Sequence, residues 1–168
     1  MQIRLKKGRD GPDSLACVRA DGTSTWRRIQ RGLAVHDLAH FAVETELGVG
    51  DGFYGLVASG WSFEDFASAE ERAKIPTGAI WVEFLVNAFL TEGMSGELSE
   101  AGVFHAGIAE AAAKLGHSPP RALSDEELAR IRGRIVSLAA RWRALPPAET
   151  LELTIGDQPA RAPGLSDR

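Results

Sequence analysis

Two histidines, His36 and His40, lie four residues apart in the apolar segment VHDLAHFAVE, which also contains Asp37 and Glu44. Successive residues of an α-helix rotate by about 100°, so these four side chains would share one arc of about a quarter turn. The other positions are apolar, which predicts a buried helix with one narrow polar stripe. Two imidazoles at this spacing can bind a single Zn²⁺ or another divalent transition metal.

A second apolar segment, AIWVEFLVNAFLTE, carries Glu83, Asn87 and Thr91 at intervals of four residues. On a helix these positions also fall within one arc of about 80°. Buried ionisable groups need a partner or a metal, so we expect the two polar stripes to face each other. Glu83 is the first candidate for a third metal ligand, and His105 in GVFHAG is the alternative.

Glu44 is not expected to bind the same metal as His36, because it lies about 12 Å further along the helix axis. Instead, Glu44 or Asn87 would orient His40 by hydrogen bonding to the imidazole nitrogen that faces away from the metal. The sequence therefore predicts a metal site with His36, His40 and Glu83 as ligands.

The segment HDLAH resembles the HExxH helix of zincin-type metallopeptidases, with Asp37 where that family has glutamate. The resemblance implies that His36 and His40 bind zinc and that Asp37 is the general base that activates water. Aspartate is one methylene shorter than glutamate, which reduces its reach. The segment is also similar to an HDxxHxxxE helix of small uncharacterised bacterial proteins, which implies no activity. The HD-domain phosphohydrolases share the His-Asp pair but need an upstream histidine, which this chain lacks.

The zincin resemblance implies a metal-dependent hydrolase with a peptide or small-molecule substrate. Two readings of the same residues need no metal. In the first, His36 and His40 form a buried network with Glu83, Glu44 and Asn87 that fixes helix register in a structural or interaction domain. In the second, the same groups perform acid–base catalysis without a metal.

The composition narrows the class of protein. With 168 residues and 44% hydrophobic content, the chain is about one domain long and can form a core. A net charge of −4 argues against nucleic-acid binding, and no apolar run approaches the ~18 residues of a membrane span. The N-terminus has no apolar region typical of a signal peptide. The single cysteine, Cys17, fits a reducing cytoplasm.

Strands are predicted at both ends of the chain. MQIRLK alternates apolar and polar residues, and Asp21-Gly22 separates two further strand-like runs. Asp-Gly favours a two-residue hairpin turn, which would place Cys17 opposite Trp26 and Val18 opposite Thr25. LELTI, after Pro146-Pro147, is predicted to join the same antiparallel sheet.

About five helices are predicted between these strands. The clearest signals are Gly48 as a C-terminal cap, Ser62 with Asp65 as an N-terminal cap, and Ser124 with Glu127 as a capping box. The predicted helical segments are 33–48, 62–73, 77–93, 99–116 and 124–145. The arginines of segment 124–145 are expected to form a solvated face rather than an anion-binding surface.

The glycine-rich segment 50–61 has two interpretations. It packs tightly against a helix, or it forms the wall of a pocket with Tyr54 offering a hydroxyl group. The whole pattern predicts an α+β fold: a helical bundle with a small antiparallel sheet from the N-terminal hairpin and the C-terminal strand. Residues 1–156 are expected to form one domain, and residues 157–168 a disordered tail.

Overall fold

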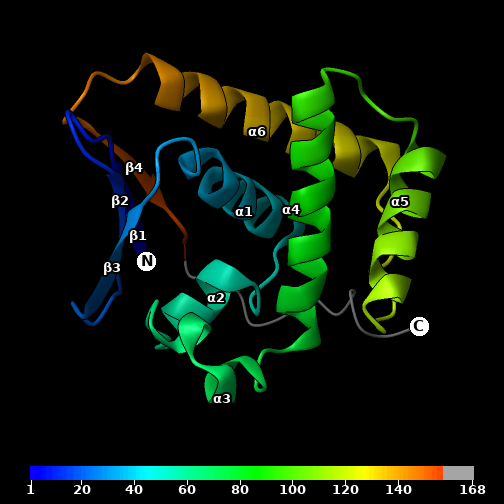
Figure 1. The fold of residues 1–168 in the computed structure, drawn as a ribbon, viewed down its shortest axis with the longest axis horizontal. Coiled ribbons are helices and arrows are strands. Elements are labelled where there is room, and N and C mark those ends of the chain that lie inside the picture. The colour runs from blue at the N-terminus through cyan, green and yellow to red at the C-terminus, as the bar shows by residue number, and fades with distance from the viewer. Residues whose placement is uncertain (157–168) are drawn as a thin grey trace.

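The computed structural model describes residues 1–156 and combines a four-stranded antiparallel sheet with a group of helices (Figure 1). The predicted α+β class is therefore confirmed. The predicted disordered tail, 157–168, lies outside the described residues. In chain order the elements are β1 Gln2–Lys6, β2 Asp13–Val18, β3 Ser24–Ile29, α1 Ala34–Leu47, α2 Phe53–Ala58, the 3-10 helix η1 Asp65–Ala67, α3 Ala69–Arg72, α4 Thr77–Ser95, α5 Ala101–Lys114, α6 Asp125–Ala144 and β4 Thr150–Thr154.

The strands follow the order β3-β2-β1-β4, so the C-terminal strand lies beside the N-terminal one. Ile3 pairs with Leu153 and Leu5 with Leu151, and all four side chains are buried. Alternation places these apolar residues on the sheet face that covers the helices. The prediction that the LELTI segment joins the N-terminal sheet is confirmed.

The predicted register of the hairpin between β2 and β3 is wrong by one residue. Cys17 lies opposite Thr25 rather than Trp26, and Val18 lies opposite Ser24 rather than Thr25. Because side chains alternate between the two faces, this shift decides which β3 residues reach the core. Thr25 is buried, whereas Trp26 is exposed.

The register differs because the turn has three residues instead of two. Arg19 N donates to Thr23 O, and Gly22 N donates to Arg19 O. A two-residue type I′ turn needs positive φ at both Asp21 and Gly22, but only Gly22 adopts it, at 84°. The Asp21 carboxylate instead accepts hydrogen bonds from the backbone N and the hydroxyl of Thr23, at 2.9 and 2.7 Å.

The helix ends follow the capping residues in two cases and depart from the prediction in a third. Gly48 ends α1 with φ of 64°, and Ser124 and Glu127 form the predicted capping box of α6. The predicted helix over 62–73 is instead divided into η1 and α3. Ser68 has extended backbone angles and caps α3 with its side chain, so it separates the two short helices.

Helix α1 lies between the sheet and α4, and α6 runs across α1 and α4 (Figure 1). Leu38 and Phe41 of α1 pack into the cluster formed with the sheet, whereas Ala39 and Val43 pack into the cluster formed with α4, α5 and α6. This position explains why α1 is apolar on nearly every side. No helix among the described residues is both long and apolar enough to cross a membrane.

Candidate metal site

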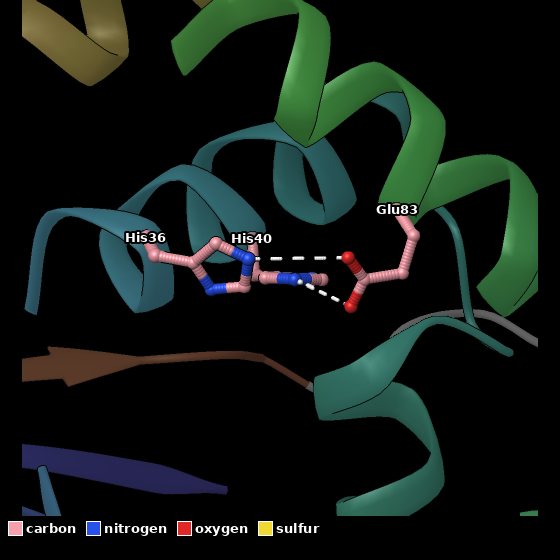
Figure 2. A group of neighbouring side chains, drawn as sticks. All are labelled: His36, His40 and Glu83. Carbon is pink, nitrogen blue, oxygen red and sulfur yellow. Dashed lines mark ion pairs between the residues drawn. The ribbon is translucent and has the colours of Figure 1, made fainter. Parts of the chain in front are cut away.

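The His36 and His40 side chains of α1 both point toward Glu83 of α4 (Figure 2). His40 Nε2 lies 3.2 Å from Glu83 Oε1, and His36 Nε2 lies 3.9 Å from Glu83 Oε2. One ligand atom from each of the three residues lies within 4.8 Å of the other two. The structure therefore brings together the three residues that the sequence predicts as ligands.

Each imidazole also has a carboxylate near its second nitrogen. His40 Nδ1 lies 3.4 Å from Glu44 Oε1, and His36 Nδ1 lies 4.0 Å from Asp37 Oδ1. A carboxylate on this side favours the ring that carries its proton on Nδ1, which leaves the Nε2 lone pair free. Glu44 therefore lies on the predicted side of His40, in ion-pair contact with Nδ1 rather than hydrogen-bonded to it.

Glu44 is fixed in turn by the start of α2. Its Oε2 accepts hydrogen bonds from Tyr54 N at 2.9 Å and from Gly55 N at 3.1 Å. These are among the first N–H groups of α2, which have no partner within the helix. A Cβ atom at Gly52 would lie 2.5 Å from Glu44 Cδ, so the close approach needs glycine at that position. The buried Glu44 carboxylate thus joins α2 to His40.

At its start, from Gly50 to Gly55, the glycine-rich segment is explained by tight packing rather than by the wall of a pocket over α1. A Cβ atom at Gly55 would lie 2.1 Å from Gly50 O. Tyr54 is fully buried, and its hydroxyl donates to Asp37 O at 3.2 Å. Because this hydroxyl already has a partner in the core, it does not line a substrate pocket.

Asp37 forms an ion pair that sequence reasoning missed. Arg27 of β3 donates from Nη2 to Asp37 Oδ1 at 2.8 Å, and Asp37 is buried. The Arg27 guanidinium also lies over the rings of Phe53 and Phe63, at 5.3 and 5.0 Å from their centroids. Three buried atoms have no hydrogen-bond partner among the described residues: Arg27 Nε, Asp37 Oδ2 and His40 Nδ1. All three belong to one connected group: His40 is a candidate ligand, Asp37 lies beside His36, and Arg27 pairs with Asp37.

The electrostatic balance keeps His40 charged while no metal is bound. Burial lowers the pKa of His40, but Glu44 and Glu83 raise it more, and the pKa rises to about 9. Burial raises the pKa of Glu83, yet the neighbouring imidazoles outweigh it and the pKa falls below its ordinary value. An imidazolium is therefore held between two carboxylates at neutral pH.

The structure does not bring the other predicted site residues to this cluster. Asn87 is exposed, and its side chain makes no hydrogen bond to a described residue. His105 Nε2 accepts a hydrogen bond from Leu123 N at 3.0 Å, between α5 and the start of α6. His105 is thus a satisfied structural histidine, and Glu83 is the residue that supplies the third ligand atom.

The donor set and spacing fit a divalent transition metal. Two imidazole nitrogens and a carboxylate oxygen are zinc ligands, and tetrahedral ligands at about 2.1 Å lie about 3.4 Å apart. The distances from Glu83 oxygens to His40 and His36, 3.2 and 3.9 Å, bracket that value. His40 is buried, whereas the side chains of His36 and Glu83 are 36% and 50% exposed, so solvent reaches one side of the site.

Comparison of the chain with protein-family models, curated proteins and solved structures found no match.

Proposed function

We propose that this protein binds one divalent transition metal, with zinc the first candidate, through His36 Nε2, His40 Nε2 and the Glu83 carboxylate. The observation that supports this most strongly is the convergence of both Nε2 atoms on Glu83. The carboxylates of Asp37 and Glu44 behind the two rings add support, because such partners are typical of histidine ligands.

Metal analysis of the purified protein tests the proposal. We expect about one equivalent of zinc per chain, as one tetrahedral site requires. His36→Ala and Glu83→Gln each remove a donor and should weaken zinc binding more than the about 10–100-fold typical of losing a supporting partner. Competition with a chromophoric chelator measures the affinity. His117→Ala is the matched control, because His117 is exposed and outside the cluster.

A second candidate function is a metal-free network that fixes α1 against α4. The observation in its favour is the position of His40, which is buried between Glu44 and Glu83 as an ion pair. If purified protein holds no metal, and zinc added in excess leaves its melting temperature unchanged, the network replaces the metal site.

The proposal extends to hydrolysis of a peptide or small-molecule substrate, as in the zincin-type enzymes that the HDLAH segment resembles. A metal bound here would act as a Lewis acid and lower the pKa of a water molecule. The half-exposed Glu83 and the partly exposed His36 would let a substrate approach. Asp37 has two candidate roles: a general base, as the resemblance implies, or a group that positions His36 through Oδ1.

Asp37→Asn separates these two roles, because it keeps the shape of the side chain and removes its charge. If Asp37 is a general base, Asp37→Asn should leave zinc affinity unchanged and lower turnover by about 10²–10⁴-fold. If Asp37 positions His36 instead, the same substitution should weaken zinc binding by about 10–100-fold. Turnover of a fluorescent peptide library and chelator competition are measured on the same samples. Parent-like values in both assays would restrict Asp37 to its pair with Arg27.

We also propose a cytoplasmic location. Cys17 is the single cysteine of the chain and is buried in the sheet. Burial, with the Asp37 charge nearby, raises the pKa of the Cys17 thiol to about 12. A protonated, inaccessible thiol is inert, and the fold contains no disulfide that would need an oxidising compartment.

A further inference from the structure

Strand β3 forms one edge of the sheet, and its outer side is open. Arg19 N donates to Thr23 O across the hairpin. Backbone groups alternate in direction along an antiparallel strand, so those of Thr25 and Arg27 point toward β2. The N–H and C=O groups of residues 24, 26 and 28 therefore point outward, and none has a hydrogen-bond partner among the described residues.

A groove of about 590 Å³ follows this open edge. One wall is β3 itself, and the other is the segment that follows α2. That second wall is fixed to the hairpin: Arg19 Nη2 donates to Trp61 O, and Phe63 N donates to Thr25 Oγ1 at 3.1 Å. The groove is therefore preformed. Its lining residues are Arg19, Ser24, Thr25, Trp26, Arg27, Arg28, Gly60, Ser62 and Glu64.

The groove is positively charged although the whole chain carries a net charge of −4. Three arginines line it against one carboxylate, Glu64. Arg27 is neutralised by Asp37, whereas Arg19 and Arg28 have no carboxylate partner among the residues that the structure describes. Trp26, on the same face of β3 as Arg28, is 60% exposed and is the one aromatic residue of the four described strands.

We propose that this groove binds an extended acidic peptide segment of a partner protein, which adds to the sheet as a fifth strand beside β3. The outward backbone groups of β3 would pair with the peptide backbone. Arg19 and Arg28 would attract its carboxylates, and Trp26 would pack on its side chains. None of the three candidate metal ligands lines the groove, so this site is separate from the metal site.

A second copy of this chain fits the groove less well than an acidic peptide. Two copies joined through β3 would each carry a net charge of −4 and would bring two sets of groove arginines together. The wall formed by Gly60, Ser62 and Glu64 also borders the space that a second sheet would enter. A single extended segment with negative charge meets neither obstacle.

Fluorescence anisotropy tests the proposal with a labelled seven-residue peptide of alternating glutamate and threonine, in chelator so that metal plays no part. We expect saturable binding that weakens at least about tenfold when lysine replaces the glutamates. Methylation of alternate backbone nitrogens should also abolish binding in one of the two registers, because strand addition depends on backbone hydrogen bonds.

Arg28→Glu should weaken peptide binding at least about tenfold, whereas Arg141→Glu, the same charge change at an exposed site on α6, should change it less than about twofold. The proposal is overturned if the acidic peptide does not bind at millimolar concentration, or if the lysine peptide binds equally well. It is also overturned if both methylated peptides bind like the unmodified one, or if oligothymidine binds and the peptide does not.

Discussion

Replacement of Glu44 by alanine is expected to lower the free energy of unfolding by about 3–5 kcal/mol, the range seen when one partner of a buried ion pair is removed. The substitution leaves His40 without one of its two carboxylates and leaves the backbone N–H groups of Tyr54 and Gly55 without their acceptor. Unfolding in urea, followed by circular dichroism on metal-free protein, measures the loss.

Glu46→Ala is the control for this experiment, because Glu46 lies on the same helix and makes only a partly exposed pair with Arg130 at 3.5 Å. Its loss should cost less than about 1 kcal/mol. Glu44→Gln should fall between the two, because the amide oxygen can still accept a hydrogen bond from α2. If Glu44→Ala costs no more than Glu46→Ala, the buried carboxylate does not hold α1 and α2 together.

Zinc affinity is expected to increase about tenfold for each unit by which the pH is raised toward 9, because a metal must displace the proton of His40. The pKa of His40 is raised to about 9 by Glu44 and Glu83. Between pH 6 and pH 8, deprotonation of His40 alone therefore predicts about a hundredfold change in affinity. Chelator competition at several pH values, with the proton affinity of the chelator taken into account, measures the slope.

The stability of the metal-free protein should move in the opposite direction with pH. A group whose pKa is higher in the folded state stabilises the fold when protonated. The contribution of His40 is thus fully present below its ordinary pKa of 6.5 and is lost as the pH rises through about 9. His40→Gln should remove this part of the pH dependence of the free energy of unfolding.

For zinc binding, an affinity that stays constant from pH 6 to pH 8 would exclude His40 as a ligand.

The sequence predicts those parts of the fold and site that depend on local rules. The ends of α1 and α6 follow from Gly48 and from the Ser124–Glu127 capping box, which act within one helical turn. His36 and His40 share a face because of helical geometry alone. Glu83 could be proposed as their partner because a charged residue in an apolar helix needs compensation.

Long-range geometry explains what the sequence does not predict. Helices α1 and α4 cross steeply (Figure 1), so their polar stripes meet at Glu83 and separate before Asn87, which is exposed. The pair between Arg27 and Asp37 joins a strand to a helix, and no spacing rule connects these two residues. The register of Thr25 depends on whether the turn has two or three residues, and the Asp-Gly pair allows both.

The pairing of β1 with β4 has a consequence for how the chain folds as it leaves the ribosome. Lys6 pairs with Thr150, and Lys7 Nζ donates to the carbonyls of Trp142 and Leu145 at the end of α6. These contacts join segments that are far apart in the sequence, and contacts of such high sequence separation form slowly. Helices α1 and α4 can meet while synthesis continues, but β1 must wait for β4. Until then it is an open sheet edge, so the nascent chain is expected to need protection from aggregation at this edge.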